Sequence, residues 1–405
     1  MTPKERVLRT LAHQEPDIVP WGEHLVDYNV YEGLLGRKSW VHAKFPETKA
    51  WWDGRREEIV ASYKRDTVDL ALALGFDLVA ANMMPAVGAE PKTMNPVDET
   101  TFEENGYLYR ISATTEDLCL LKTPTRPFEE PTLASLQEQI DQVDAEGVPA
   151  PDESSWEVVR HVKQTLGDDH FIVTFGGDIG FPGFGWSDAE FYLNVALHPE
   201  LHAKLTELAA KKAIAGLKYY AGEVDGVIGA ADYGSSSALL ASPRIMQEHM
   251  VYWMKAITDE AHRLGLKFLK HSCGCLWEAL PFFVEAGYDA YEGVQASAGM
   301  DMKDLKRLYG DKLTLWGGVT NENLILGSPE QVRQDALYAL RYGAPGGGFI
   351  YGASHSLMIG TKLENLLVMK EMRDRYGVYP IDIPAGEGLA PGFPVPITLP
   401  EKYRC

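Results

Sequence analysis

The alternation of short apolar runs with longer segments of helical period is the feature that most constrains the fold of this chain. Eight apolar runs occur, at residues 18–21, 77–81, 171–175, 226–230, 267–269, 290–294, 313–316 and 348–351. Strands that alternate with helices form parallel sheets through right-handed crossovers, and eight of them favour a closed (β/α)8 barrel of the α/β class, the TIM barrel. An open doubly wound sheet is the alternative, but the turn after the first run has no GxGxxG pattern.

Helical periodicity fills most of the chain between these runs. It covers residues 189–221, 243–264, 276–286, 302–309, 329–342 and 363–376. Ser242 and Pro243 have the residue types preferred at the cap and the first position of a helix. Four of the segments end at a glycine, where a left-handed C-terminal cap is common. We therefore expect such caps at Gly287, Gly310, Gly343 and Gly377.

Residues 91–151 interrupt the alternation and are predicted to be an insertion after the second strand. The apolar runs 107–111 and 118–121 indicate a hairpin, and a proline-rich, acidic linker is expected to follow it. The last residues, 381–405, hold several prolines and little periodicity. The sequence thus predicts one barrel domain over 1–380, with an inserted hairpin and linker, and a proline-rich tail.

The charge balance excludes several classes of partner. Lys and Arg total 38 against 58 Asp and Glu, a formal charge of −20, whereas nucleic-acid and anionic-membrane surfaces are basic. No apolar run approaches the ~20 residues of a membrane span. Four cysteines in 405 residues do not make a disulfide framework, and the first residues predict an amphipathic helix rather than a signal peptide. We expect a cytoplasmic protein that binds neither nucleic acid nor membrane.

His271 and Cys273 are the strongest candidate ligands for a metal. They lie two residues apart at the end of the fifth predicted strand, so their side chains share a face. In a barrel, the carboxyl ends of the strands form the active site, and imidazole with thiolate suits zinc. A catalytic zinc site needs at least three protein ligands, and His355 after the eighth strand could supply the third.

Other polar residues follow the strand ends and are candidates for the same site. Glu292 stands among apolar neighbours, which favours an inward carboxylate with a purpose. The remaining candidates could bind substrate or could cap turns and pack: Glu23, His24, Asp178, Asp232, Tyr233 and Trp316. The loop 180–186, rich in glycine and aromatic residues, could be a lid or an apolar wall through Phe181, Phe184 and Trp186.

The chain resembles the uroporphyrinogen decarboxylase superfamily, which includes zinc-dependent methyltransferases that work with corrinoid proteins. The resemblance runs from Arg6 to about Tyr376. It is carried by residues 6–8, 15–20, 225–227, 232–234, 242–243, 271–274, 316–319 and 347–350. The family fold is a (β/α)8 barrel, in agreement with the strand count.

Two departures from the family patterns bear on function. True decarboxylases carry an arginine-rich segment after the first strand, but residues 21–27 contain acids and no arginine, so porphyrin decarboxylation is not expected. The methyltransferases hold zinc with a His-x-Cys-Gly pair and a late cysteine; here the late position reads Ser354-His355. Either His355 is the third ligand, or zinc is absent and the histidines bind substrate or move protons.

The resemblance implies a zinc-dependent methyltransferase that acts between a small methylated compound and a corrinoid carried by a partner protein. Zinc held by one thiolate and two neutral histidines keeps positive charge and would polarise an ether oxygen, which favours a methoxylated compound such as a methoxylated aromatic. Glu23, Asp232 and Glu292 are the candidate catalytic residues. The alternatives are a metal-free decarboxylase or lyase on a small acid and a non-catalytic corrinoid- or tetrapyrrole-binding protein. A monomer or a homodimer is expected.

Overall fold

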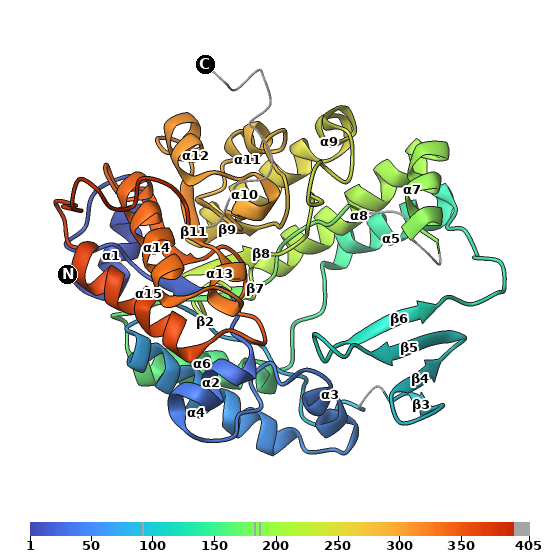
Figure 1. Cartoon of the computed structure of the whole chain (residues 1–405). Helices are drawn as coiled ribbons and strands as arrows, with labels where there is room; N and C mark the ends of the chain where they lie inside the picture. The colour runs from blue at the N-terminus through green and yellow to red at the C-terminus, as the bar shows by residue number, and fades with distance from the viewer. Residues whose placement is uncertain (91–92, 182–183, 186–187, 393–405) are drawn as a thin grey trace.

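The computed structural model describes residues 1–90, 93–181, 184–185 and 188–392 (Figure 1). Within them, eight parallel strands form a sheet in chain order, and this confirms the predicted barrel topology. The strands are β1 (Gly22–Glu23), β2 (Leu78–Ala80), β7 (Phe171–Phe175), β8 (Gly226–Gly229), β9 (Lys267–His271), β10 (Ala290–Glu292), β11 (Thr314–Val319) and β12 (Phe349–Ala353). A parallel bridge between Trp21 and Tyr351 closes the barrel, with the Tyr351 N–H donating to the Pro20 carbonyl at 2.8 Å.

Helices cover the outside of the barrel; all six segments of predicted helical period contain helix, and further helices form between residues 28 and 166 where none was predicted. Those that follow the strands and pack along the barrel are α4 (Arg56–Leu74), α6 (Glu157–Leu166), α8 (Pro199–Leu217), α10 (Val251–Arg263), α11 (Leu280–Ala286), α12 (Met302–Tyr309), α14 (Pro329–Gly343) and α15 (Leu363–Tyr376). The chain also forms α1 (Pro3–Leu11), α2 (Tyr28–Leu35), α3 (Lys44–Trp52), α7 (Asp188–Leu197), α9 (Pro243–His249) and α13 (Asn321–Ile325).

Two long predicted helices are each divided in the structure. The segment 189–221 is α7 and α8, because Pro199 has no N–H to continue the helix and its ring crowds the preceding turn. The segment 243–264 is α9 and α10, although the Met250 N–H still donates to the Met246 carbonyl, so this break is a local distortion.

The predicted glycine caps are correct at one position only. Gly287 has a φ of 80° and ends α11 in the left-handed conformation. Gly310 and Gly377 have φ values of −65° and −86°, and Gly343 is the last helical residue of α14, so the prediction is wrong at these three positions. At Gly310 and Gly377 a Cβ would lie 2.6 Å from the carbonyl oxygen four residues earlier, so space and not backbone conformation favours glycine.

The barrel interior is filled by side chains. Among the described residues, the inward positions of the strands form one buried apolar cluster with Val7 and Leu11 of α1: Leu78, Phe171, Val173, Ile228, Leu269, Ala290, Trp316 and Ile350. A second, larger apolar layer packs between the strands and the helices. Since the barrel is packed and is not a pore, its chemistry belongs to the mouth where the strands end.

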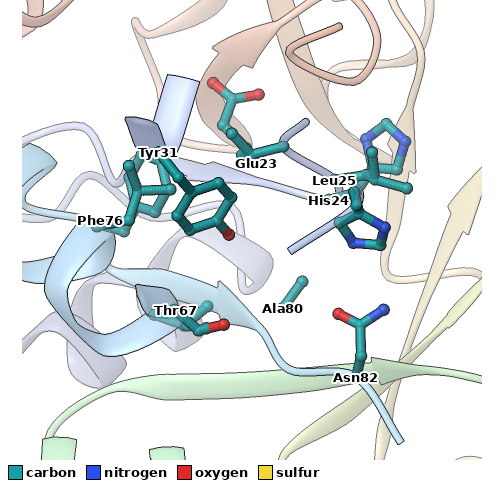
Figure 2. Close-up of a pocket in the computed structure, with 12 residues that line it drawn as sticks. Glu23, His24, Leu25, Tyr31, Thr67, Phe76, Ala80 and Asn82 are labelled. Atoms are coloured by element: carbon teal, nitrogen blue, oxygen red, sulfur yellow. The ribbon is translucent and has the colours of Figure 1, made fainter. Parts of the chain in front are cut away.

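A small cavity lies beside β1 and β2. Its volume is about 20 Å³, roughly the space of one water molecule. Figure 2 shows its walls, with His24, Tyr31, Thr67 and Asn82 contributing polar atoms. The Glu23 carboxylate points away from Thr67 and Asn82 in this view. The cavity is therefore a polar packing space next to the mouth and is too small for a substrate.

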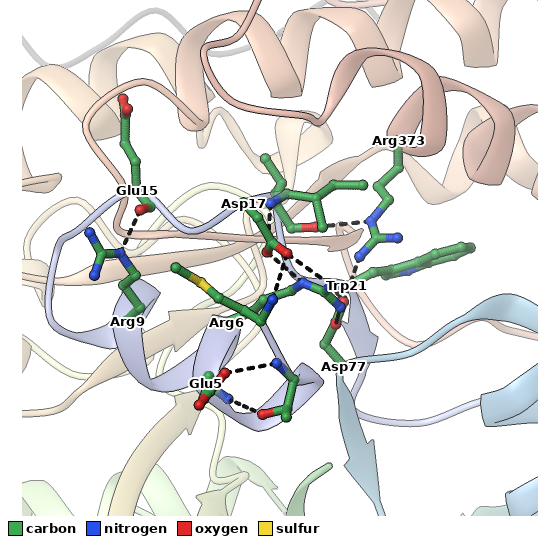
Figure 3. A network of polar contacts seen from close by, with 12 residues as sticks. Glu5, Arg6, Arg9, Glu15, Asp17, Trp21, Asp77 and Arg373 are labelled. Carbon is green, nitrogen blue, oxygen red and sulfur yellow. Dashed lines mark hydrogen bonds and ion pairs between the residues drawn. The ribbon is translucent and has the colours of Figure 1, made fainter. Parts of the chain in front are cut away.

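An ion-pair network ties the amino-terminal ends of the first strands to α1 and α15 (Figure 3). Asp77, which precedes β2, binds Arg6 at 3.0 Å and Arg373 at 2.6 Å, and it accepts the Trp21 N–H at 3.0 Å. Asp225 and Asp289 accept backbone N–H groups in the same way before β8 and β10. These aspartates stabilise the end of the barrel opposite the mouth.

We expect Asp77→Ala to lower the free energy of unfolding by about 3–5 kcal/mol, the usual cost of breaking a buried ion pair. The Asp77 and Arg373 side chains are 2% and 8% exposed, so both arginines and the Trp21 N–H would lose a shielded partner. Chemical denaturation measures the change. Asp53→Ala is the matched control, because the exposed Lys49–Asp53 pair contributes well under 1 kcal/mol. Equal effects of the two substitutions would contradict the prediction.

Residues 95–122, which belong to the insertion after β2, form a four-stranded antiparallel sheet. Its strands are β3 (Asn95–Pro96), β4 (Thr101–Glu104), β5 (Tyr107–Ile111) and β6 (Leu118–Lys122). The predicted hairpin is confirmed as β5 and β6, and two strands precede it. The sheet packs on α3, where the Phe102 ring lies 5.0 Å from Phe45 and 5.4 Å from Trp52. Figure 1 shows it standing beside α3, apart from the barrel strands.

The predicted linker after the hairpin contains a helix, so that part of the prediction is wrong. Residues Leu133–Glu146 form α5, and Thr132 caps it by accepting the Ser135 N–H. Leu136 and Ile140, four residues apart, bury one face of α5 against Leu208 of α8. This packing stabilises the helix. The helix was not predicted because its composition is mostly polar and acidic and its apolar stripe is short.

The described part of the tail, residues 381–392, runs along α14. Arg341 donates to the carbonyls of Ile383 and Pro384, at 3.0 and 2.6 Å.

Within the described residues, no helix has both the length and the apolar composition that crossing a bilayer would require.

Candidate metal centre

The centre of the site is Glu292, whose carboxylate contacts two histidines at the mouth of the barrel. Glu292 ends β10 and is paired in register with His271 at the end of β9. Leu269 and Ala290 point into the barrel two residues earlier on each strand, so His271 and Glu292 also point inward. One carboxylate oxygen accepts from the Nδ1 atom of His271, and the other lies 3.0 Å from the Nδ1 atom of His24.

This contact sets which nitrogen of His271 is available. The Glu292 carboxylate accepts a hydrogen bond from the protonated Nδ1 of His271. The Nε2 atom on the opposite side of the ring therefore keeps its lone pair, and it lies 3.4 Å from the Cys273 sulfur. Burial alone would raise the pKa of Glu292, but the two imidazoles hold it well below its usual range. Burial lowers the pKa of His271, but the Glu292 charge outweighs this and raises it. A carboxylate behind a ligand histidine is the usual support of a metal site.

Cys273 places its sulfur between two imidazoles. The chain turns after β9, and Asp232 holds this turn by accepting the Cys273 N–H at 2.8 Å. The sulfur then lies 2.8 Å from Nε2 of His355. Burial and the Asp232 carboxylate raise the pKa of the Cys273 thiol far above its ordinary value. The protein alone therefore keeps this thiol protonated, and a thiolate here requires a cation beside it.

His355 has a neutral imidazole in a defined tautomer. Burial lowers its pKa to about 4. Its Nδ1 accepts the Ser356 N–H at 2.7 Å, so the proton of the neutral ring lies on Nε2 and points at the Cys273 sulfur. To bind a metal through Nε2, the ring must move this proton to Nδ1 and turn away from the Ser356 N–H. His355 can thus be a hydrogen-bond donor to sulfur or, after this change, a ligand.

Two sets of residues have the spacing of a metal site among the described residues: His271, Cys273 and His355, and His24, His271 and Glu292. Ligands of a tetrahedral zinc lie about 3.5 Å apart, close to the 3.4 Å between His271 Nε2 and Cys273 Sγ. In the second set, both Glu292 oxygens are already taken by imidazoles, and all three residues are buried. The first set combines soft and borderline donors with partial exposure, so it fits a catalytic zinc better.

The first set opens on a cavity of about 350 Å³, large enough for a small organic molecule. Cys273 and His355 form one wall, and the described remainder is Gln295, Asn321, Glu322, Ile325, Leu326, Ser354 and Met358. Apart from Ser354, sequence reasoning missed this remainder. The sequence signal was present at Asn321-Glu322-Asn323, which follows Thr320 after the end of β11.

Glu23 and His24 lie close in sequence but have different surroundings. The Glu23 carboxylate accepts from the Trp21 indole N–H at 2.8 Å and from the Ala353 N–H, so it joins β1 to β12. Burial raises its pKa to about 8. The His24 ring stacks on His271 with ring centres 4.3 Å apart, and its Nε2 lies 3.0 Å from the Ser356 hydroxyl. The structure thus brings His24 into the centre and gives Glu23 a position in barrel closure.

Asp178 and Tyr233 form a separate buried group with Lys270, a residue that sequence reasoning missed. The fully buried Lys270 ammonium binds Asp178 at 2.5 Å and lies 4.3 Å from the centre of the Tyr233 ring. Lys270 alternates with the inward residues of β9, so it points to the helices and not into the mouth. Asp232 is half exposed, with Oδ1 at 3.8 Å from His271 Nε2, and it borders the centre.

Among the described aromatic candidates, Trp316 borders the centre, with its ring edge-on to His24 and the ring centres 6.4 Å apart. Trp316 lies within the barrel core, and its indole N–H donates to the Gly22 carbonyl at 2.8 Å. Phe181 packs against His202, and Phe184 against Phe128 and His198. Trp186 lies outside the described residues.

Known proteins resemble this chain in sequence over its second half and in fold over most of its length. Residues 182–376 match the family model of uroporphyrinogen decarboxylase, URO-D. This segment belongs to the URO-D family. The URO-D match includes β8 to β12 and therefore His271, Cys273, Glu292 and His355. It starts well after Arg6, where the resemblance was expected to begin. No curated protein matches the chain in sequence.

Solved structures extend the likeness to the first half of the chain. A methyltransferase from Methanosarcina mazei has a TM-score of 0.63 and 16% identity, over 93% of this chain and 99% of that one. A B12-independent methionine synthase from Shewanella sp. W3-18-1 has a TM-score of 0.44 and 11% identity, over 88% and 98%. The first comparison shows that the whole URO-D-like barrel, and not only residues 182–376, shares its fold with a methyltransferase.

Proposed function

We propose that this URO-D-family protein is a zinc-dependent methyltransferase that moves a methyl group between a small methylated compound and a corrinoid protein. The observation that carries the proposal is the Glu292–His271–Cys273 arrangement, in which a buried carboxylate aims an imidazole nitrogen at a thiol on a cavity wall. A methoxylated aromatic compound is the methyl donor that we favour.

Each residue of the centre has a defined task. His271, Cys273 and His355 would hold the metal, and Glu292 keeps the His271 proton on Nδ1 so that Nε2 stays free. Asp232 fixes the Cys273 backbone through its N–H. Zinc bound by one thiolate and neutral imidazoles supplies a Lewis acid for an ether oxygen. The apolar side chains of Ile325 and Met358 exclude water from the substrate.

The corrinoid partner rests on the resemblance and on chemical need. A methyl group released from an ether requires a strong nucleophile, and a Co(I) corrinoid on a partner protein is the acceptor in the branch that this chain resembles. A metal-free decarboxylase is a weaker candidate. No lysine or arginine is found among the described residues of the cavity wall, so a substrate carboxylate would lack a counter-charge.

Metal analysis combined with a transfer assay tests the proposal. Protein purified without chelator should contain about one zinc per chain, and it should methylate free cob(I)alamin from a methoxylated aromatic compound. Removing zinc with a chelator should abolish transfer, and adding zinc back should restore it. A protein that neither contains nor binds zinc would contradict the proposal.

The affinity for zinc should rise with pH. The raised pKa of Cys273 means that a proton occupies the sulfur over the neutral range, and zinc must displace it. Each proton released raises the apparent affinity about tenfold per pH unit. The raised pKa of His271 allows a second proton to add to the slope at low pH, whereas neutral His355 adds none. Chelator competition at pH 6, 7 and 8 measures this, and a flat profile would contradict thiolate ligation.

A further inference from the structure

Gln295 is part of the cavity wall beside Cys273 and His355, and the protein uses only one end of its side-chain amide. Its Oε1 atom accepts the Gly274 N–H at 3.1 Å. A backbone N–H can bond only to the oxygen end of an amide, so this contact fixes which end of the Gln295 side chain is which. The Nε2 group, with its two donor hydrogens, is the end that remains for another partner.

The free end of Gln295 is open to a ligand. Within the described residues, Nε2 has no hydrogen-bond partner. Gln295 is half-buried, and its Nε2 is not among the unpartnered atoms that are shielded from solvent, unlike Asn321 Oδ1 in the same wall. Because this nitrogen is accessible and its residue lines the cavity, it offers the cavity an uncharged hydrogen-bond donor.

The position of this donor relative to the metal ligands limits where on a substrate it can act. Gly274 directly follows Cys273 and turns the chain with a φ of 90°. The Gln295 amide, bound to the Gly274 N–H, therefore lies beside the ligand sulfur and not at the far end of the cavity. An ether oxygen held at the metal then brings the neighbouring ring position, and not the opposite one, within reach of Nε2.

We propose that Gln295 is a specificity residue of this cavity and donates a hydrogen bond to a second oxygen next to the reacting methoxy group. The preferred class is thus an aromatic ring with two neighbouring oxygen substituents. Ile325, Leu326 and Met358 suit the ring itself, since methionine sulfur packs well against ring edges. This inference rests on the proposed function, because it assumes that the cavity holds the methyl donor. Gln295 binds the substrate and takes no part in methyl transfer.

Binding measurements on zinc-loaded protein test the inference without using activity. Isothermal titration compares 1,2-dimethoxybenzene with 1,4-dimethoxybenzene, which have the same atoms and differ in the spacing of their oxygens. The unsubstituted protein should bind the 1,2 compound about 3- to 10-fold more tightly, the usual range for a hydrogen bond between neutral groups.

Gln295→Glu is the decisive variant, because a carboxylate still accepts the Gly274 N–H but presents an acceptor where Nε2 was. The preference for 1,2-dimethoxybenzene should fall to near one or below. 2-Methoxyphenol, whose hydroxyl can donate, should then bind more tightly than 1,2-dimethoxybenzene. Gln331→Glu is the matched control: Gln331 also accepts a backbone N–H, that of Ser328, but it begins α14 and is not among the described residues of the cavity wall. This control should keep the preference.

Two outcomes would overturn the inference: a ratio near one in the unsubstituted protein, and a ratio that Gln295→Glu leaves unchanged. If Gln295→Glu does not fold or does not hold zinc, Gln295→Met removes the donor without adding charge and should also bring the ratio to near one. Zinc content and methyl transfer are measured on the same protein. A selective cavity without transfer refutes the proposed function alone, and transfer without selectivity refutes this inference alone.

Discussion

Replacing Cys273 with alanine should reduce bound zinc from about one per chain to almost none and lower methyl transfer by about 10³-fold or more. The sulfur lies within reach of both His271 and His355, so its loss leaves two imidazoles and no thiolate. A Lewis acid is worth several kcal/mol in the transition state, and each 1.4 kcal/mol corresponds to a factor of ten. Zinc content by mass spectrometry of metals and initial rates with cob(I)alamin measure the two effects.

Cys275→Ala is the matched control for this experiment. Cys275 lies two residues further along the chain, but it is buried in the apolar layer between strands and helices. Its backbone N–H donates to the Ser235 carbonyl, a bond that alanine keeps. We expect this variant to retain zinc and most of its activity. If both variants lost zinc equally, the cause would be disruption of the turn after β9 and not loss of a ligand.

Replacing Glu292 with glutamine should weaken zinc binding and activity by about 10- to 100-fold, the usual effect of removing the group that orients a ligand histidine. Each carboxylate oxygen faces the Nδ1 atom of one imidazole, His24 or His271. An amide has one oxygen and one NH2 group, so one imidazole would meet a donor in place of an acceptor. The variant also removes the negative charge that raises the pKa of His271, so this pKa should fall.

Glu23→Gln separates this effect from a general loss of a buried carboxylate. Glu23 is equally buried at the same mouth, but it accepts from Trp21 and Ala353 and contacts neither ligand histidine. Because burial raises its pKa to about 8, Glu23 is mostly neutral at pH 7, and glutamine resembles that form. We expect zinc content to stay unchanged. Comparable zinc loss in both variants would show that Glu292 acts through barrel stability.

The strands of the barrel were predictable because their burial depends on local composition. Residues 171–175 were predicted as a strand and form β7 with the same bounds, since a fully buried parallel strand is a continuous apolar run. The first strand was displaced: residues 18–21 are mostly an approach to the barrel, and β1 is Gly22–Glu23. The α5 helix was missed because its stability comes from contact with α8, which local composition does not record.

The site was predictable only where two ligands lie two residues apart at the end of one strand. His271 and Cys273 were paired from their spacing, and the structure places their side chains together. The contact of Glu292 with His24 and His271 joins strands β1, β9 and β10, whose residues lie far apart in the chain. Lys270 was overlooked beside His271 because the alternation of the strand points it away, where Asp178 neutralises it.

The sequence by itself determined the barrel topology and the His271–Cys273 pair, because strand periodicity and spacing of two residues are local properties. The tertiary structure alone decided which nitrogen of His271 is free and that the Cys273 thiol needs a cation. These properties depend on burial and on the charges of residues from other strands. Closing the barrel brings those residues together and removes water from between them.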